Sequence, residues 1–242
     1  MSTLEGGGKI VTDGLILYYD GANPQSYISG DTVCNDLSIT QITGTLENGV
    51  TYDTDNNGSW VFDGLDDYIE MDEFSFSGTQ ITVSIWNFGE RVDKKQGVFV
   101  IGTTNTGAGG VYQRCIALLI PWDNSTVYFD AGDATIPYLT GFDRISKLAT
   151  TAECNGWHHW VFTKDSVTGY QRIYHDGILW HSETGKTIPL ISDGLTSIGR
   201  FKGGSSEHYQ QGRVSQLMIY NRELSASEVS QNYNASKARY NL

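Results

Sequence analysis

The stretch SWVFDGLDDYIEM, residues 59–71, places two short apolar runs on either side of a tight acidic turn. Gly64 is expected to make the bend, and the aspartates beside it to cap the turn, because Asp side chains hydrogen-bond nearby backbone N–H groups. Phe62 and Tyr68 are expected to anchor the two strands. Six acidic residues fall between positions 60 and 74, so the stretch also suggests an active site or a metal-binding loop.

Outward from this turn, short apolar strands alternate with turn signals from Gly14 almost to the end of the chain. In ITVSIWNF (81–88) the apolar residues at 81, 83 and 85 alternate with Thr82, Ser84 and Trp86, which indicates a strand with two distinct faces. The other main predicted strands are LILYYD (15–20), GVFVIGT (97–103), RCIALLI (114–120), TVYFDAG (126–132), GWHHWVFTKD (156–165), YQRIYHDGILWHS (170–182), LTSIGRF (195–201) and GRVSQLMIYNR (212–222).

Asp176-Gly177, inside one of these segments, is a strong signal for the turn of a β-hairpin. Residues 133–153 are expected to form a long irregular connection. A single helix is predicted at about 225–238, because Ser225 and Glu228 have the spacing of a capping box. Many strands without helical crossovers predict an all-β fold, in which antiparallel sheets pack as a sandwich with one short C-terminal helix.

Composition and charge limit the function. The 242 residues carry a formal net charge of −12, which argues against a general affinity for nucleic acid or for anionic membranes. No apolar run reaches the roughly 18 residues that a membrane span needs, so no membrane insertion is expected. Cys34, Cys115 and Cys154 are far apart and show no metal-ligand spacing.

The N-terminal residues 1–13 are Gly-rich and weakly patterned, and are expected to form an arm ahead of a single domain at 14–242. The opening MSTLEGGGKIVTDG has no apolar core of the kind found in secretory signal peptides. Synthesis in a cytoplasm is therefore expected.

Six segments, in order, resemble the laminin-G-like branch of the concanavalin-A-like lectin/glucanase superfamily. They are LILYYDGANPQSY, SWVFDGLDDYIEM, ITVSIWNF, GWHHWVFTKD, RIYHDGILWHS and GRVSQLMIYNRELSASEV. Each motif is weak alone, but their order supports the resemblance over about residues 14–240. The resemblance implies a jelly-roll sandwich of two curved antiparallel sheets.

The opening YYDGANPQSY and the closing YNRELSASEVSQNYNASKARYNL are similar to domains in structural proteins of tailed bacteriophages. This similarity implies a non-enzymatic virion protein: a capsid decoration, fibre or tail component, made in the host cytoplasm. Its partners would be other capsid or tail proteins and glycans of the host or environment. A homo-oligomer, such as a trimer, would add weak contacts through multivalency.

Catalysis is a weaker hypothesis. Glucanases of this superfamily use carboxylates in a pattern such as Glu-x-Asp-x-x-Glu, and sugar cleavage needs the paired acids at a defined separation. Glu70, Asp72 and Glu73 provide only a fragment of that pattern, because position 74 is Phe and position 75 is Ser. Lyases of the superfamily use Arg, Gln or His, and Tyr on one concave sheet. Here Arg172, Tyr174 and His175 coincide with the ordinary hairpin.

Calcium is the better hypothesis for a metal, although no cofactor is expected to be required. Calcium prefers several oxygen ligands from carboxylates and carbonyls. The resemblance implies one ligand in the opening strand, where Asp20 lies, and acids in the closing strand, where Ser215 and Gln216 stand instead. Asp63 and Asp66 are local alternatives, and turn capping is the competing interpretation of both.

Sugar binding needs exposed aromatic side chains surrounded by polar groups. Trp86 and Trp180 are expected in the core or on an inner sheet face, and His158 and His159 are expected to face opposite sides of one strand as structural residues. For Trp122, partial burial in a loop tip is the competing interpretation. The candidate carbohydrate-binding residues are Tyr112, Arg114, Trp122, Asn124, Tyr128 and Tyr138.

Three functions stay open. The first is the non-enzymatic virion protein that adheres to glycans. The second is a free carbohydrate-binding lectin, which would bind glycans as an isolated monomer. The third is a polysaccharide-degrading glucanase or lyase, which would release reducing or unsaturated ends.

Overall fold

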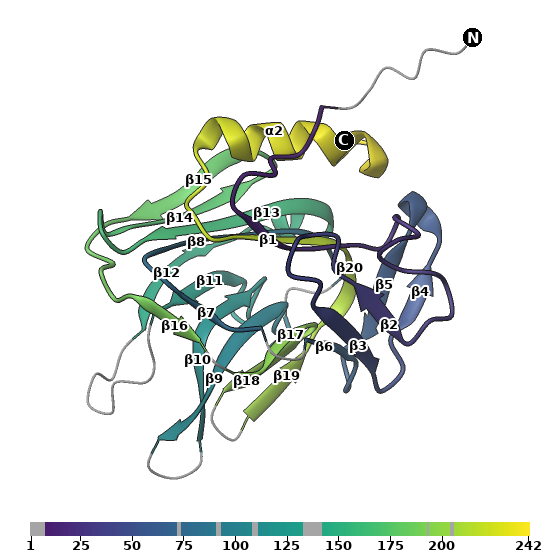
Figure 1. The fold of residues 1–242 in the computed structure, drawn as a ribbon, viewed down its shortest axis with the longest axis horizontal. Helices are drawn as coiled ribbons and strands as arrows, with labels where there is room; N and C mark the ends of the chain where they lie inside the picture. Colours follow the sequence, from purple (N-terminus) through teal and green to yellow (C-terminus); the bar gives the residue numbers. More distant parts are fainter. Residues whose placement is uncertain are drawn as a thin grey trace.

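Two antiparallel sheets of eight strands each, called sheet A and sheet B, pack against one another. The C-terminal helix α2 lies across the outer face of sheet A (Figure 1). The computed structural model describes residues 8–71, 74–90, 93–107, 111–132, 142–192, 194–203 and 206–242. The predicted all-β jelly-roll sandwich with one short C-terminal helix is confirmed.

Sheet A has the strand order β15-β14-β13-β8-β20-β5-β4, and β1 also pairs with β20. Its strands are β1 (Leu15–Asp20), β4 (Thr51–Asp53), β5 (Ser59–Asp63), β8 (Gln80–Gly89), β13 (Gly156–Asp165), β14 (Tyr170–His175), β15 (Ile178–Glu183) and β20 (Gln211–Tyr220).

Sheet B has the order β12-β11-β10-β9-β17-β6-β3-β2. Its strands are β2 (Val33–Asn35), β3 (Thr43–Glu47), β6 (Tyr68–Met71), β9 (Phe99–Gly107), β10 (Val111–Leu119), β11 (Thr126–Ala131), β12 (Asp143–Leu148) and β17 (Thr196–Ile198). Two small sheets pair β7 (Phe76–Gly78) with β16 (Leu190–Ser192), and β18 (Arg200–Gly203) with β19 (Ser206–Tyr209). The helices are η1 (Asp55–Asn57), α1 (Thr151–Cys154), α2 (Ala226–Ser236) and η2 (Lys237–Tyr240).

The stretch 59–71 is a crossing between the two sheets, because β5 belongs to sheet A and β6 to sheet B. Gly64 makes the bend with a φ of 79°, a conformation that favours glycine. Asp63 Oδ1 accepts from Leu65 N at 2.7 Å, and Asp67 Oδ2 accepts from Asp63 N at 3.0 Å. The predicted capping role is therefore confirmed for Asp63, with Asp67 adding a second bond across the turn, and the turn directs Phe62 into the core.

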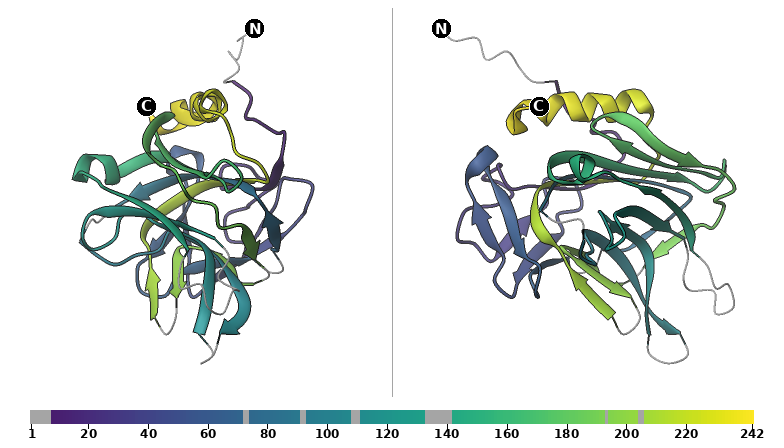
Figure 2. Two further views of the ribbon diagram at one scale, coloured as in Figure 1. Left: turned by 90° about the vertical axis from the view of Figure 1, so that its left-hand side faces the viewer. Right: turned by 180° about the vertical axis from the view of Figure 1, so that it is seen from behind.

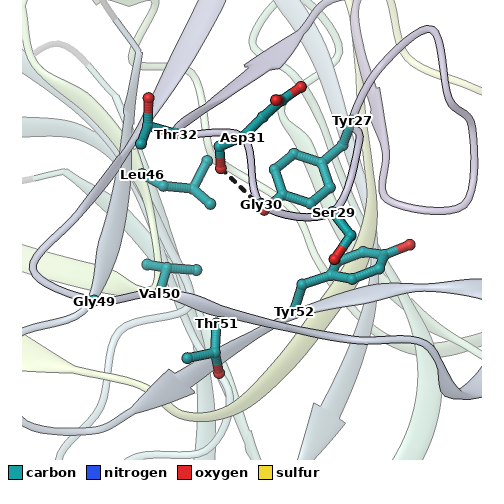
Figure 3. A pocket seen from close by; sticks show the side chains of 10 residues that line it. All are labelled: Tyr27, Ser29, Gly30, Asp31, Thr32, Leu46, Gly49, Val50, Thr51 and Tyr52. Carbon is teal, nitrogen blue, oxygen red and sulfur yellow. Dashed lines mark hydrogen bonds between the residues drawn. The ribbon is translucent and has the colours of Figure 1, made fainter.

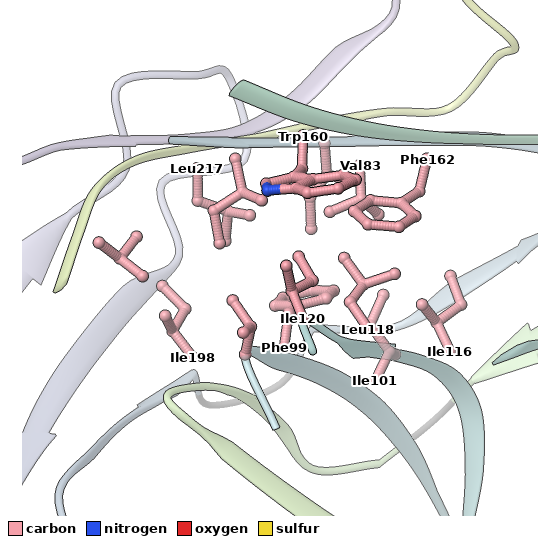
Figure 4. Close-up of a cluster of buried hydrophobic side chains, with 14 of the residues drawn as sticks. Val83, Phe99, Ile101, Ile116, Leu118, Ile120, Trp160, Phe162, Ile198 and Leu217 are labelled. Atoms are coloured by element: carbon pink, nitrogen blue, oxygen red, sulfur yellow. The ribbon is translucent and has the colours of Figure 1, made fainter. Parts of the chain in front are cut away.

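The core lies between the sheets, where alternate residues of facing strands meet (Figure 4). Val83, Trp160, Phe162 and Leu217 come from sheet A, and all four are fully buried. The labelled residues that face them from the other layer are Phe99, Ile101, Ile116, Leu118, Ile120 and Ile198. The alternation predicted for 81–88 is confirmed, because Ile81, Val83 and Ile85 all join this core.

The other face of sheet A is buried under the C-terminal helix. Trp86 stacks on Tyr240 with 3.9 Å between ring centroids, and donates from Nε1 to Ser236 Oγ at 2.8 Å. Ser225 and Glu228 form the predicted capping box at the start of α2. Among the described residues no helix is long and apolar enough to cross a membrane.

Part of the predicted N-terminal arm belongs to the domain. Val11 is buried, its N–H donates to Asn232 Oδ1 at 2.8 Å, and its carbonyl accepts from Tyr220 Oη at 3.0 Å. Residues 1–7 lie outside the described residues.

The connection expected to be irregular at 133–153 contains β12 and α1, so that expectation was wrong where the structure describes the chain. In β12 only Ile145 is fully buried, because the strand lies at the edge of sheet B. One apolar anchor in an otherwise polar strand does not produce the alternating pattern of a half-buried strand.

Candidate functional site

Aromatic and polar side chains gather on the outer face of sheet B, the layer that α2 does not cover. They come from the β10–β11 loop and from β11, β12, β18 and β19. We call this group the Trp122 surface; it consists of Trp122, Asn124, Tyr128, Arg144, Phe201 and His208. Figure 2 shows that β18 and β19 lie beside the β9 and β10 strands, on the side of the molecule away from α2.

The β10–β11 loop holds its tip in one conformation through local hydrogen bonds. Trp122 N donates to Thr126 O, and Ser125 N donates to Trp122 O, both at 2.9 Å. Asn124 bridges the loop and the strand, since its Oδ1 accepts from Thr126 N at 3.1 Å and its Nδ2 donates to Tyr128 Oη at 2.8 Å. The loop therefore places an indole, an amide and a phenol next to one another.

The Trp122 ring is half-buried against other aromatic rings. It meets Phe201 edge to face, with 5.9 Å between centroids, and His208 in the same manner at 4.9 Å. Phe201 packs closely on Gly97, where a Cβ atom would lie 2.1 Å from the Phe201 Cβ. Only glycine fits against the backbone and Cβ of Phe201 at this point, so Phe201 is held closely to the segment that precedes β9.

The charges beside these rings are paired. Arg144 donates from Nε and Nη2 to the two carboxylate oxygens of buried Asp130, at 2.5 and 2.7 Å. This bidentate contact raises the pKa of Arg144, while the guanidinium stays 41% exposed and lies 4.7 Å from the Tyr128 ring centroid. Burial, followed by the nearby charge of Lys95, lowers the pKa of His208, so its imidazole is neutral at pH 7.

The arrangement suits a polar ring-shaped ligand. Tyr and Trp rings offer apolar faces, and an exposed guanidinium, an amide and a phenol offer hydrogen bonds to hydroxyl groups. Arg144 is fixed by its carboxylate partner and so presents its remaining N–H donors at low entropic cost.

Of the six predicted carbohydrate-binding residues, Trp122, Asn124 and Tyr128 are brought together here. The partial burial considered for Trp122 is confirmed. Tyr112 and Arg114 lie on β10, but their side chains, and the whole of Tyr138, fall outside the described residues. Sequence reasoning missed Arg144, Phe201 and His208, which reach the Trp122 surface from distant strands.

The surroundings of Asp20 do not fit a calcium ion. Its carboxylate accepts from Arg239 Nη1 at 2.7 Å, from Gln216 Nε2 at 3.1 Å and from Tyr18 Oη at 3.0 Å. These neighbours are donors, and Arg239 already supplies a positive charge, whereas calcium needs further oxygen ligands. Asp63, Asp66 and Asp67 offer oxygens within 4.8 Å of one another, and a calcium site there stays a prediction.

The residues considered for catalysis are engaged elsewhere or separated. Glu70 forms an ion pair with Arg200 at 3.1 Å, while Asp72 and Glu73 lie outside the described residues. Tyr174 is buried under α2 on the outer face of sheet A. His175 has the opposite orientation and contacts the core residue Trp160, so the two cannot serve one concave face.

A concavity of about 450 Å³ lies between the loop that precedes β2 and the β3–β4 hairpin (Figure 3). The Tyr27 and Tyr52 rings form one wall, tilted at 43° with centroids 5.0 Å apart. Their hydroxyl groups donate to Asp31 O at 3.0 Å and to Gly21 O at 2.8 Å. Both hydroxyl groups therefore donate their protons to backbone carbonyls of the protein and not to a ligand in the concavity.

Comparisons with known proteins agree with this fold. The receptor binding domain of botulinum neurotoxin C/D mosaic serotype is similar with a TM-score of 0.68 and 15% identity, over 92% of this chain and 51% of that one. The botulinum neurotoxin serotype D ligand binding domain, solved in complex with N-acetylneuraminic acid, gives a TM-score of 0.66 and 16% identity, over 92% and 51%. The chain thus spans about half the length of these toxin domains.

A bacterial domain matches along its whole length. Domain 4 of AbnA, an extracellular arabinanase from Geobacillus stearothermophilus solved in complex with arabinotriose, gives a TM-score of 0.66 and 17% identity, over 92% of this chain and 100% of that one. No curated protein sequence matches the chain. A family model matches residues 62–230, well over half of the chain. The chain therefore belongs to the laminin-G-like family of the concanavalin A-like lectin/glucanases superfamily.

Proposed function

We propose that this chain is a non-enzymatic carbohydrate-binding module that holds a sugar against the Trp122 surface. The observation that carries the proposal is the juxtaposition of Trp122 and Tyr128 with the polar groups of Asn124 and Arg144. A sugar ring has apolar C–H faces and a rim of hydroxyls, so it needs both kinds of group in one place. Two of the similar structures, the serotype D toxin domain and the arabinanase domain, were solved in complex with N-acetylneuraminic acid and with arabinotriose, which supports a saccharide as the ligand.

The chemistry of the surface favours a neutral or acidic sugar. Arg144 is exposed and stays cationic, because the carboxylate of Asp130 raises its pKa. A guanidinium donates to hydroxyls and can pair with a sugar carboxylate, whereas the net charge of −12 disfavours polyanions elsewhere on the molecule. Single contacts of this kind are weak, so repeated copies on one particle would strengthen adhesion.

We propose further that the module is carried on a bacteriophage particle, as a capsid decoration, fibre or tail component. The similarity of its opening and closing segments to phage structural proteins supports this setting. Lys9 and α2, joined by the bond from Gln231 Nε2 to Lys9 O at 2.7 Å, lie on the outer face of sheet A. Attachment through either would leave the Trp122 surface, on the opposite layer, directed outward.

The first experiment is a glycan array on the full chain, with and without EDTA, followed by titration of the best ligand. We expect Trp122→Ala to weaken binding about fivefold or more, if a sugar face stacks as strongly as a nucleobase, for which stacking on an aromatic ring contributes roughly 1–3 kcal/mol. Tyr170→Ala is the matched control, because Tyr170 is 39% exposed on β14, where its ring packs on Arg172, and it is not part of the Trp122 surface. Equal affinity in both variants would remove the Trp122 surface from the proposal.

Two further measurements test the remaining parts. Incubation with the bound polysaccharide should release no reducing or unsaturated ends, and steady release would establish an enzyme instead. Immunogold electron microscopy of phage particles should label the virion. Unlabelled particles that still react with capsid antibodies would remove the virion setting and leave glycan binding untouched.

A further inference from the structure

Three metal-ligating side chains converge at one end of sheet A. His158 lies near the start of β13, His175 ends β14, and Asp176 begins the β14–β15 turn. His158 Nδ1 is 2.9 Å from Asp176 Oδ2, and His175 Nδ1 is 3.6 Å from the same oxygen. The two imidazole centroids are 4.5 Å apart, so both rings present Nδ1 to a single carboxylate oxygen.

The hydrogen bond on the far side of His175 defines which nitrogen carries its proton. His175 Nε2 lies 3.1 Å from the carbonyl oxygen of Glu153, which can only accept a hydrogen bond. Nε2 is therefore the protonated nitrogen of the neutral ring, and Nδ1 carries a lone pair. That lone pair lies 3.6 Å from Asp176 Oδ2, too far for a hydrogen bond, while His158 Nδ1 hydrogen-bonds to the same oxygen at 2.9 Å. An ion placed among the three atoms would replace that hydrogen bond and bind all three.

The carboxylate is held equally firmly. Asp176 Oδ1 accepts from His159 N at 2.9 Å, which leaves Oδ2 directed at the two imidazoles. Asp176 and Gly177 have φ angles of 50° and 79°, as a tight two-residue hairpin turn requires. A Cβ at Gly177 would lie 3.0 Å from the Tyr233 ring, so α2 packs directly on the turn. Such supporting bonds on the far side of His175 and Asp176 are typical of metal sites.

The spacing and the donor set identify the class of ion. Zinc bonds of about 2.0–2.2 Å in tetrahedral geometry separate neighbouring donor atoms by roughly 3.3 Å. The observed separations of 2.9 and 3.6 Å lie on either side of that value. Two imidazoles and one carboxylate suit Zn²⁺, whereas calcium and magnesium prefer oxygen ligands throughout.

We propose that His158, His175 and Asp176 bind one Zn²⁺ ion, with water in the fourth position. The three side chains are 14%, 13% and 23% exposed, so an ion can reach them from solvent while the site stays mostly enclosed. The ion links the start of β13 to the β14–β15 hairpin. It lies on sheet A, so it is independent of glycan binding at the Trp122 surface.

The test uses the full chain without an affinity tag, titrated with ZnCl₂ by calorimetry and followed by thermal unfolding. We expect one equivalent to bind and the unfolding temperature to rise. Asp176→Asn tolerates the positive φ and should weaken binding by about tenfold or more, as should His175→Gln. His181→Gln is the matched control, because His181 pairs with Glu183 on β15 and is not one of the three ligands. Equal zinc affinity in Asp176→Asn and His181→Gln would overturn the proposal.

Two readouts remain if the variants fold poorly. Co²⁺ added to the wild-type chain should give the intense visible absorption of a tetrahedral site, and Zn²⁺ should displace it. Anomalous diffraction at the zinc edge should place one peak between the three donor atoms. A peak elsewhere, or a response to calcium but not zinc, would show that this cluster is not a zinc site.

Discussion

The ammonium group of Lys164 lies 2.7 Å from Asp143 Oδ2 and 2.8 Å from Ala131 O, in the interior where sheet A faces sheet B. Lys164 is fully buried on β13, whereas Asp143 belongs to β12 of the opposite sheet. Burial lowers the pKa of Lys164, and the hydrogen bond that Lys164 donates to Asp143 acts against that shift. The ion pair therefore joins the two sheets, and Asp143 neutralises an ammonium group that is fully shielded from solvent.

Asp143→Asn should destabilise the fold by about 3–5 kcal/mol, because a buried charge is left without its counter-charge. Lys164→Met should cost less, since Asp143 is 13% exposed on its side chain and still accepts from Ile188 N at 2.9 Å. Urea unfolding of both single variants and the double variant measures this. Additive losses in the double variant would show that the two groups do not interact.

Glu228 should make stability depend on acid pH. Its carboxylate pairs with Arg222 at 2.7 Å and completes the cap with Ser225, and these contacts lower its pKa from 4.5 to about 2. A depressed pKa in the folded state stabilises the protein above the unfolded value, and that contribution disappears as pH falls from about 4.5 to about 2.

Glu228→Gln tests this window directly. Wild type should have the higher unfolding temperature at pH 7, and the difference should shrink through the window and vanish near pH 2. A difference that persists unchanged at pH 2 would mean that Glu228 acts through packing and not through its charge.

Asn232 should secure the N-terminal segment. It is fully buried, accepts from Val11 N at 2.8 Å and donates to Tyr220 Oη at 3.0 Å. Asn232→Ala leaves the Val11 N–H and the Tyr220 hydroxyl without the Asn232 amide, which should lower the free energy of unfolding by about 1–3 kcal/mol. Trypsin should then cleave after Lys9 faster than in wild type.

Asn234→Ala is the control for that experiment, because Asn234 lies exposed on the same helix and bonds to Ser230 O at 2.8 Å. Its change in stability should stay within about 0.5 kcal/mol. Equal protection of Lys9 in both variants would show that Val11 is held by its other contacts.

The sequence predicted most of what depends on local pattern. The hairpin at Asp176-Gly177 and the capping box at Ser225 involve residues close in the chain, and both are found. Trp122, Asn124 and Tyr128 were grouped correctly because they lie close together in the chain, on the β10–β11 loop and the start of β11.

What could not be predicted depends on strand register and on contacts between distant segments. His158 meets His175 only because β13 and β14 pair with Trp160 opposite His175. Arg239, near the C-terminus, pairs with Asp20 near the N-terminus, so a carboxylate that suggested calcium has an internal cation. A shift of one residue in the β13–β14 register would remove the contact between His158 and His175, so no local sequence pattern encodes it. The Arg239–Asp20 pair joins the two ends of the chain and has no local pattern either.

The arrangement of Asn124 should matter for binding more than for stability. Its amide donates to Tyr128 Oη at 2.8 Å and its Oδ1 holds Thr126 N, yet the site is exposed to solvent. We expect Asn124→Ala to leave the unfolding temperature almost unchanged, because water replaces these bonds. Glycan affinity should fall roughly two- to tenfold, the equivalent of one hydrogen bond of about 0.5–1.5 kcal/mol. Tyr128→Phe, which removes only the hydroxyl, should cause a similar loss. If both variants bind glycan like wild type, the sugar lies elsewhere on sheet B.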